Sequence, residues 1–222
     1  MKKYFFIILL FQSSFIVGQT IQQIDSLTTK MCESLSDINQ VKDEVKIAMI
    51  VQKHFPGFYK KFNITTQNLE DTLGDKVFYR LQKNCTNFIS LLNKLEENKS
   101  DWKTLTKKPK LEISKNNCTN FLNGGNYYYK EYDGKIVNVL ITLDNWTETF
   151  EDNTKSKLLF HPKNNCEFEL EFIQSDNKSR KNFSIKGDIY KYGIYKLKDG
   201  VFDVWVNGKD NTIYSFRMYR KS

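Results

Sequence analysis

The spacing of apolar residues predicts helices in the first part of the chain. From Ile21 to about Glu97, apolar side chains recur every three or four residues, which places them along one face of a helix. This spacing runs through three segments, residues 21–35, 38–51 and 69–95. Pro56-Gly57 is a stop signal for the second segment, and Thr66 is a suitable N-cap for the third. We therefore expect three antiparallel helices whose apolar faces form a core.

After Cys118 the period changes from that of a helix to that of a strand. In the segment CEFELEF, residues 166–172, cysteine or apolar residues alternate with glutamates. Similar short segments are YYYKEY, KIVNVLITL, WTETFE, KLLFH, DIYKYGIYKL, VFDVWV and TIYSFRMY, and turn signals such as NGG, DG and KDG separate them. These features predict an antiparallel β meander of about eight strands, closed as a small barrel or folded as a sandwich.

Between residues 98 and 117 neither period is present. The segment contains Pro109 and a cluster of lysines, as expected of a solvated connection between folded units. We predict an α+β chain with a three-helix module at residues 19–98, a linker at residues 99–116 and an antiparallel β module at residues 117–222. A single α+β unit is the alternative for a chain of this length.

The first eighteen residues have the layout of a secretory signal peptide. Lys2 and Lys3 precede an apolar run from Tyr4 to Leu10 that continues, with an interruption, to Val17. This run is shorter than the ~20 residues that span a bilayer, and no later run of ~18 apolar residues follows. We therefore expect removal of residues 1–18 and a mature protein that is secreted or periplasmic and has no transmembrane segment.

Charge narrows the choice of partners. The chain has 34 lysines and arginines and 26 aspartates and glutamates, a net charge of +8, or +6 without Lys2 and Lys3. The lysines alternate with acidic residues, as on a solvated surface, and an anion-binding patch is the alternative. Only four of the basic residues are arginines, whose forked guanidinium suits phosphate recognition. We therefore expect no nucleic-acid partner.

The four cysteines, Cys32, Cys85, Cys118 and Cys166, favour two disulfides in a secreted chain. Three connectivities are open to four cysteines, and the sequence alone does not choose among them. Each cysteine has a natural partner within its own half: Cys32–Cys85 would join two helices, and Cys118–Cys166 would tie strands together. The cysteines form no closely spaced pair of the C-x-x-C kind, so we expect no metal site.

The pentapeptide NCTNF occurs at residues 84–88 and again at residues 117–121. The first copy lies on the apolar face of the third predicted helix, and the second lies at the entrance to the β half, where helix periodicity is absent. We therefore interpret the repeat as coincidence.

Both copies match the N-x-S/T pattern of glycan acceptors, as do Asn63, Asn98, Asn145, Asn177 and Asn182, which would become candidate glycan sites in a eukaryotic protein.

Two cysteine motifs mark the start and the middle of the β half. They are Cys118-x-x-Phe121-x-x-Gly124 and, shortly after Phe160, Cys166-x-Phe168-x-Leu170. These residues resemble a group of small secreted proteins of Gram-negative bacteria with a C-x-x-F-x-x-G start and a W-x-x-x-C-x-[YF]-x-L strand. Phe160 replaces the tryptophan at a different spacing. The resemblance covers about residues 117–219, and it implies secretion and a paired Cys118 and Cys166 without a mechanism.

The sequence offers few catalytic candidates. His54 stands near the end of the second predicted helix, where a cation complements the helix dipole, and His161 precedes Pro162 in a predicted turn. The chain contains no nucleophile elbow, zinc-protease helix, P-loop or dinucleotide-binding turn. Neighbouring carboxylates occur at Glu148 and Glu151, and along the polar face of one strand at Glu167, Glu169 and Glu171. We expect no catalytic residue, no cofactor and no metal.

Aromatic residues are abundant in the β half. Alternation along the strands directs some of them away from the core, where exposed rings could hold a sugar or a small apolar ligand. The candidate ligand-binding residues are Tyr127, Tyr129, Trp146, Tyr192 and Trp205. The alternative is cross-strand packing, because tyrosine is favoured in sheets.

We predict a secreted, non-enzymatic binding or interaction protein whose partner is a small molecule, a glycan or a protein. One alternative is a lipocalin-like carrier of a small apolar ligand, or a sugar binder, that uses exposed tyrosine and tryptophan. The other is a secreted hydrolase, in which His54 or His161 would meet carboxylates in a cleft.

Overall fold

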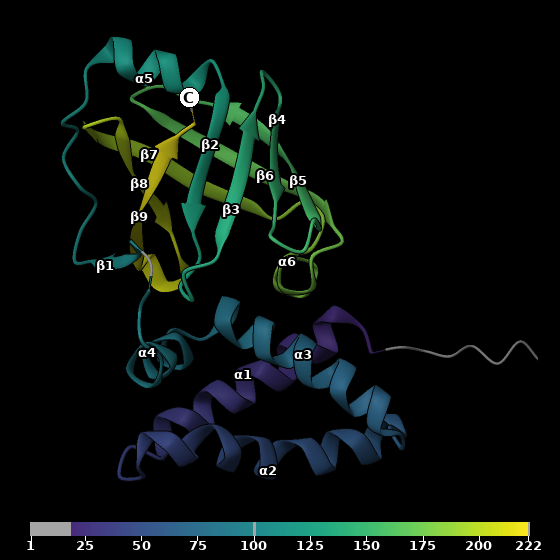
Figure 1. Cartoon of the computed structure of the whole chain (residues 1–222). Helices are drawn as coiled ribbons and strands as arrows, with labels where there is room; N and C mark the ends of the chain where they lie inside the picture. Colours follow the sequence, from purple (N-terminus) through teal and green to yellow (C-terminus); the bar gives the residue numbers. More distant parts are fainter. Residues whose placement is uncertain (1–18, 100, 222) are drawn as a thin grey trace, which may run out of the picture.

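A layer of helices lies beneath an antiparallel β-barrel in the computed structural model, which describes residues 19–99 and 101–221 (Figure 1). The helical layer comes from the N-terminal part of the chain and the barrel from the C-terminal part, as the change of period near Cys118 predicts. The predicted signal peptide, residues 1–18, lies outside the described residues.

Residues 19–99 form four helices, α1 (Ile21–Asp37), α2 (Asp43–Phe62), α3 (Gln67–Asn84) and α4 (Thr86–Leu95). Thr20 begins α1 with a capping box: its hydroxyl accepts from the Gln23 N–H at 3.3 Å, and the Gln23 side chain accepts from the Thr20 N–H at 2.9 Å. Thr66 caps α3, as its position in the sequence predicts. α2 ends at Asn63, whose φ of 52° is left-handed.

Two expected helix boundaries are wrong. Pro56 lies inside α2, which continues because the rings of Phe58 and Tyr59 beyond it pack against the helical core. The third predicted helix, residues 69–95, is broken at Cys85, where φ and ψ of −134° and 101° are those of a strand. The apolar spacing continues through this break, so the pattern of residues does not reveal it.

The four helices bury their apolar faces around a common core. The most deeply buried side chains, each 0–2% exposed, include Ile24, Met31, Ile50, Leu73 and Phe88. Burial of one such side chain contributes about 1.5–3 kcal/mol to the free energy of folding. A disulfide between Cys32 and Cys85 joins α1 to the break between α3 and α4, as expected.

Eight strands close the barrel: β2 (Gly125–Lys130), β3 (Ile136–Ile141), β4 (Asn145–Thr149), β5 (Lys155–Pro162), β6 (Glu167–Ser175), β7 (Ile189–Lys198), β8 (Val201–Asn207) and β9 (Ile213–Arg220). Each strand pairs antiparallel with the next, and the pairs Tyr127–Arg220 and Tyr128–Tyr219 join β9 back to β2. The predicted α+β chain with an antiparallel meander is confirmed, and the meander closes as a barrel.

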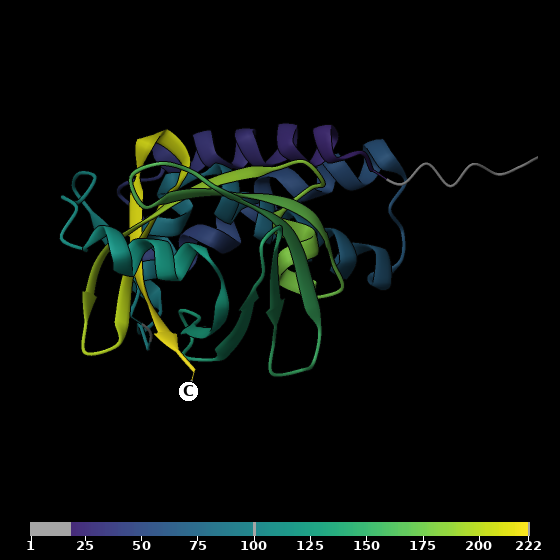
Figure 2. The same cartoon turned by 90° about the horizontal axis from the view of Figure 1, so that it is seen from above.

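Short helices cover the two ends of the barrel (Figures 1 and 2). α5 (Lys115–Leu122) lies across one end and buries Phe121 completely against Tyr127 and Phe202, with ring centroids 4.8 and 5.0 Å away. α6 (Lys178–Phe183) lies at the other end, where it contacts α3 of the helical layer. The barrel is therefore closed at both ends by its own chain.

Both copies of NCTNF place a disulfide cysteine and a buried phenylalanine about one helical turn apart. The second copy lies within α5, so the expectation that it is not helical is wrong. Eight residues are too few to show a periodic apolar face, and the helix begins where the Ser114 hydroxyl accepts from the Asn117 N–H at 3.2 Å. Cys118 of this copy pairs with Cys166, which is the second expected disulfide.

The predicted linker, residues 99–116, contributes to the wall of the barrel. Its residues Lys103–Leu105 form β1, which pairs with β9 next to the place where β2 joins β9. Trp102 stacks on Phe216 with ring centroids 4.4 Å apart, and its indole N–H donates to the Lys130 carbonyl at 2.7 Å. The barrel therefore consists of eight strands with β1 as an additional edge strand.

The helical layer meets the barrel through α3 and α6. Arg80 of α3 is 4% exposed, and its Nε and Nη2 each donate to the carboxylate of Asp25 in α1 at 2.7 Å. Its Nη1 donates to the carbonyl of Phe183, the last residue of α6, at 2.8 Å. Lys83 of α3 forms an ion pair with Asp188, just before β7. One buried guanidinium thus connects two helices of the layer to the barrel.

Candidate functional site

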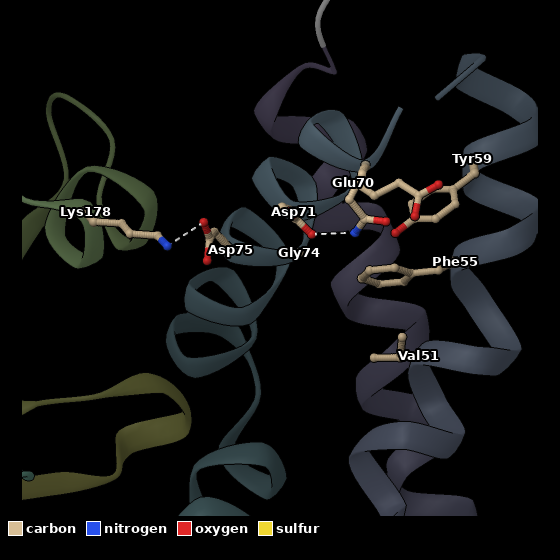
Figure 3. Close-up of a pocket in the computed structure, with 9 residues that line it drawn as sticks. Val51, Phe55, Tyr59, Glu70, Asp71, Gly74, Asp75 and Lys178 are labelled. Carbon is tan, nitrogen blue, oxygen red and sulfur yellow. Dashed lines mark hydrogen bonds and ion pairs between the residues drawn. The ribbon is translucent and has the colours of Figure 1, made fainter. Parts of the chain in front are cut away.

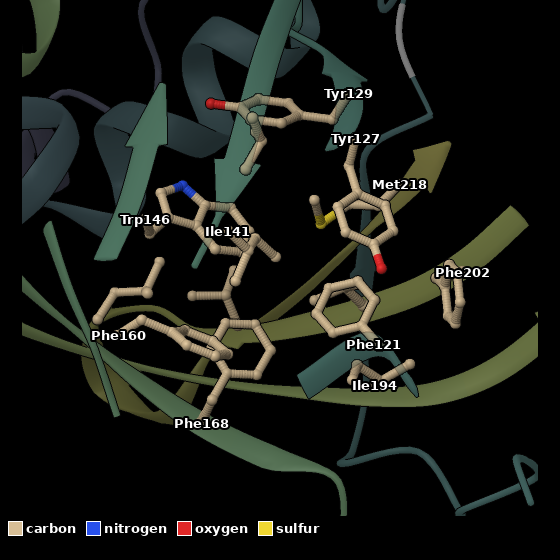
Figure 4. Close-up of a cluster of buried hydrophobic side chains, with 14 of the residues drawn as sticks. Phe121, Tyr127, Tyr129, Ile141, Trp146, Phe160, Phe168, Ile194, Phe202 and Met218 are labelled. Carbon is tan, nitrogen blue, oxygen red and sulfur yellow. The ribbon is translucent and has the colours of Figure 1, made fainter. Parts of the chain in front are cut away.

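Most of the aromatic residues predicted to bind a ligand point into the barrel. Tyr127, Tyr129 and Trp146 are 0, 4 and 2% exposed and belong to one buried cluster (Figure 4). Tyr192 packs against the same cluster and stacks on Phe168, with ring centroids 5.2 Å apart and planes 6° from parallel. Side chains therefore fill the space in which a lipocalin-like carrier would hold its ligand.

Trp205 lies outside this cluster, on β8, and is only 4% exposed. Its ring covers Gly193 of the neighbouring strand β7, where a Cβ atom would come within 2.6 Å of the indole. The ammonium group of Lys108, in the connecting segment, lies 4.5 Å from the ring centroid. The structure therefore does not bring the five predicted residues together at one exposed surface, and their role in binding stays a prediction.

An ion-pair cluster closes the end of the barrel that faces α6. Arg180 of α6 donates from Nε to Glu148 Oε2 at 3.2 Å and from Nη2 to the Tyr129 hydroxyl at 2.8 Å, and it also pairs with Glu131. Tyr129 donates in turn to Glu148 Oε1 at 2.9 Å, and burial raises the pKa of its hydroxyl well above the usual value. Both oxygens of the buried Glu148 are thus engaged, and we interpret the cluster as a structural closure of the barrel.

His54 contacts a serine. Its Nε2 lies 2.9 Å from the hydroxyl of Ser34 in α1, and Lys53 donates to the same hydroxyl at 2.9 Å. The Ser34 hydroxyl thus accepts from Lys53 and shares a second hydrogen bond with His54 Nε2, in which the tautomer of the imidazole decides the donor. Burial, followed by the positive charges of Lys53 and Lys30, lowers the pKa of His54 below 6.5. These contacts do not support the hydrolase alternative, in which His54 meets carboxylates.

The outward glutamates of β6 form surface ion pairs. Lys108–Glu167 and Lys163–Glu169 are ion pairs with separations of 2.6 and 3.0 Å, and His161 Nε2 lies 3.5 Å from the carboxylate of Glu171. The side chains of Lys108, Lys163 and His161 are 42–50% exposed, so the second histidine of the sequence lies on a solvated surface. Glu151 accepts a hydrogen bond from the Ile136 N–H at 3.0 Å, at the edge of β3.

Within residues 19–99 and 101–221, no three histidine, cysteine, aspartate or glutamate side chains are grouped as metal ligands. None of the helices in the same residues is long and apolar enough to cross a membrane. The four cysteines are all consumed by the two disulfides.

An open groove of about 560 Å³ lies between α2 and α3 (Figure 3). Val51, Phe55 and Tyr59 of α2 are four residues apart, so they form one apolar and aromatic side of the groove. Glu70, Asp71 and Asp75 of α3 form the opposite, acidic side. The groove therefore combines an aromatic surface with several carboxylates.

Hydrogen bonds and charge define the acidic side of this groove. The Gln67 amide donates to Asp71 at 2.8 Å, and the ammonium group of Lys178, which reaches over from α6, pairs with Asp75 at 2.8 Å. Burial, followed by the negative charges of Glu70 and Asp71, raises the pKa of the Tyr59 hydroxyl. A lysine of the chain itself thus lines the edge of the groove, and the carboxylates of Glu70 and Asp71 lie near Tyr59.

Gly74 keeps the groove open. It lies in the interior of α3, where glycine costs about 1 kcal/mol relative to alanine. A Cβ atom built at Gly74 would meet no atom within 4 Å, so a larger side chain there would extend into the groove without a clash at its base.

The sequence contains no signal for this groove. Glu70, Asp71 and Asp75 occupy polar positions of a helical period, where solvated carboxylates are the ordinary interpretation. Only the packing of α2 beside α3 places them opposite Phe55 and Tyr59.

Comparison of the chain with protein-family models, with curated proteins and with solved structures gives no match in any of the three.

Proposed function

We propose that this chain is a secreted, non-enzymatic binding protein whose groove between α2 and α3 receives lysine or arginine side chains of a partner protein. The signal-like leader and the two disulfides support an oxidising compartment outside the cytosol. The resemblance of the β half to secreted proteins of Gram-negative bacteria agrees with that compartment.

The observation that carries the proposal is the ion pair between Lys178 and Asp75. Lys178 of α6 lines the groove and pairs with Asp75, which supports a preference of its acidic side for a lysine or arginine. Farther along the same side, Glu70 and Asp71 have no lysine, arginine or histidine within ion-pair distance in the described part of the chain. A second cation of a partner would therefore find carboxylates that no internal cation neutralises.

The aromatic side of the groove strengthens this preference. Phe55 and Tyr59 have ring centroids 5.4 Å apart and planes 58° from parallel. A lysine or arginine stem packs against such rings, and its charged end gains about 0.5–2 kcal/mol from the ring electrons. The rest of the protein has excess positive charge, which would repel a basic partner from most other surfaces. Specificity would thus come from a local acidic groove on a basic protein.

A labelled pentalysine peptide tests the proposal. We expect it to bind, with an affinity that falls as sodium chloride is added, because the carboxylates are near the surface. A pentaglutamate peptide of the same length should not bind. Fluorescence anisotropy measures both titrations, and amide shifts in NMR spectra should map the bound peptide to α2 and α3.

Two variants separate groove binding from general attraction between charges. Gly74→Leu should abolish peptide binding by filling the groove, and it should raise the thermal stability, because leucine is the better helix former. Glu70→Gln combined with Asp71→Asn should weaken binding about tenfold or more. Glu167→Gln combined with Glu169→Gln removes the same charge from β6 and should leave binding unchanged. Equal losses in the two double variants, or full binding by Gly74→Leu, would contradict the proposal.

A further inference from the structure

Two tyrosines form a stacked pair beside a groove of the barrel surface. Tyr128 of β2 and Tyr219 of β9 lie directly opposite each other where the barrel closes, with ring centroids 4.8 Å apart and planes 13° from parallel. They line an open groove of about 430 Å³ together with Val201 and the turn between β7 and β8. Both rings are only partly buried, so part of this aromatic surface is accessible to a ligand.

The tyrosine pair is held in place from one side. The Tyr219 hydroxyl donates to Asp101 Oδ2 at 2.5 Å, and Arg217 donates to the other oxygen of the same carboxylate at 3.2 Å. Gly200, in the turn across the groove, has a φ of 78°, and a Cβ atom there would meet no atom within 4 Å. The aromatic surface is therefore preorganised, and the space above the turn is open.

The charge of this groove is unusual within the molecule. Of the four arginines, Arg80, Arg180 and Arg217 each form ion pairs with carboxylates. Arg220 forms no ion pair in the described residues; its guanidinium lies 5.9 Å from the ring centroid of Tyr127, its cross-strand neighbour. Arg220 lines the groove beside Lys221, which forms no ion pair there either. Asp199 lines the same groove and offers an acceptor for hydroxyl groups. The groove thus presents two cations without a carboxylate partner, one acceptor and an aromatic pair.

We propose that this groove binds an acidic saccharide, a chain of sugar rings that carry carboxylate or sulfate groups. The apolar C–H face of a sugar ring packs against the open side of the Tyr128–Tyr219 stack, its hydroxyl groups bond to Asp199, and its acidic group pairs with Arg220 or Lys221. A nucleic acid would need a longer basic stripe to follow its phosphates, and an apolar ligand would leave both cations without a partner. This site is independent of the groove between α2 and α3.

The test compares four probes on the full chain without its leader: tetragalacturonate, a sulfated heparin tetrasaccharide, neutral maltotetraose, and sulfate ion alone. We expect at least one of the acidic tetrasaccharides to bind and to shift amide resonances of β2 and β9 in NMR spectra. The stronger of the two identifies carboxylate or sulfate as the acidic group. Maltotetraose and sulfate ion should bind at least about tenfold more weakly, because each supplies only part of the contacts.

Variants locate the bound saccharide. Arg220→Gln should weaken binding about tenfold, whereas Lys191→Gln, which removes the same charge from the exposed face of β7, should leave it unchanged. Tyr128→Ala should lower the affinity for both acidic probes; if that variant is less folded in a thermal melt, Tyr128→Leu takes its place. Binding of maltotetraose as strong as that of the acidic probes, equal losses in Arg220→Gln and Lys191→Gln, or no binding of either acidic probe would overturn the proposal.

Discussion

At the scale of single residues, two tyrosines on the same strand have opposite energetic roles. Tyr127 and Tyr129 both point into the barrel from β2 and are almost completely buried. The Tyr129 hydroxyl accepts from Arg180 and donates to Glu148, whereas the Tyr127 hydroxyl has no hydrogen-bond partner in the part of the chain that the structure describes. Burial of a hydroxyl without a partner opposes folding.

Removal of the two hydroxyl groups should therefore have different effects. Tyr129→Phe should lower the free energy of unfolding by about 1.5–3 kcal/mol, because it breaks hydrogen bonds with charged partners. Tyr127→Phe should leave that free energy unchanged or raise it by up to about 1 kcal/mol. Urea unfolding followed by tryptophan fluorescence measures both values. If Tyr127→Phe lost as much free energy of unfolding as Tyr129→Phe, the conclusion that the Tyr127 hydroxyl has no hydrogen-bond partner would be refuted.

A residue of a strand can bind a ligand at the surface only if its side chain faces away from the barrel core, and the sequence does not fully determine this direction. Alternation correctly separates inward from outward positions on β6, but it does not say which face of a closed barrel meets solvent. Tyr127 and Trp146 therefore proved to be core residues, and Tyr128, one residue away, lies at the surface groove. The contact of the Trp205 ring with Lys108 could not be predicted from alternation, because Lys108 lies far from Trp205 in the sequence.

At the scale of elements, His54 makes the contact between α1 and α2 dependent on pH. Its pKa is lowered in the folded state by burial, Lys53 and Lys30, and it has an ordinary value near 6.5 in the unfolded chain. As the pH falls below about 6.5, the unfolded chain takes up the proton first, so the stabilising contribution present above that pH is lost. A protonated His54 could only donate to Ser34, because both of its ring nitrogens would then carry protons.

We therefore expect wild-type protein to lose more stability between pH 7.5 and pH 5.5 than the His54→Gln variant loses. His161→Gln removes the other histidine, which is exposed on β5, and serves as the control. Urea unfolding at the two pH values, followed by circular dichroism, gives the differences in free energy. The same pH dependence in His54→Gln and wild type would exclude His54 as its source.

Elements with repeated patterns were predictable, and short elements were not. The eight barrel strands follow from alternation and from turn signals such as the Asp-Gly in the turn between β7 and β8. α6 has six residues and β1 has three, which is too short for either period to appear. These elements form because the barrel supplies their partners: β9 pairs with β1, and Glu148 binds Arg180 of α6.

At the scale of the whole molecule, Arg80 should couple the unfolding of the helical layer to that of the barrel. It is buried between Asp25 and the Phe183 carbonyl, which belong to the two parts. Arg80→Gln should lower the free energy of unfolding by about 2–3 kcal/mol, because a partly buried carboxylate and a carbonyl lose a charged donor. Arg217→Gln, whose ion pairs are on the barrel surface, should cost less than about 1 kcal/mol.

The positions of the tryptophans make this coupling measurable. All three lie after residue 100, so tryptophan fluorescence reports the barrel, whereas circular dichroism at 222 nm reports mainly the helical layer. The two signals should change together when wild-type protein unfolds and should separate in Arg80→Gln. Coincident transitions in Arg80→Gln would show that other contacts suffice to couple the two parts.

The two disulfides also have a consequence for the order in which the chain can be oxidised. Cys32 pairs with Cys85, and Cys118 pairs with Cys166, so each cysteine is joined to its neighbour in the sequence. A chain that enters an oxidising compartment with its N-terminus first exposes a complete pair before the third cysteine arrives. The correct partner is then the only thiol within reach when the first bond closes, and the protein can mature without exchange between mispaired cysteines.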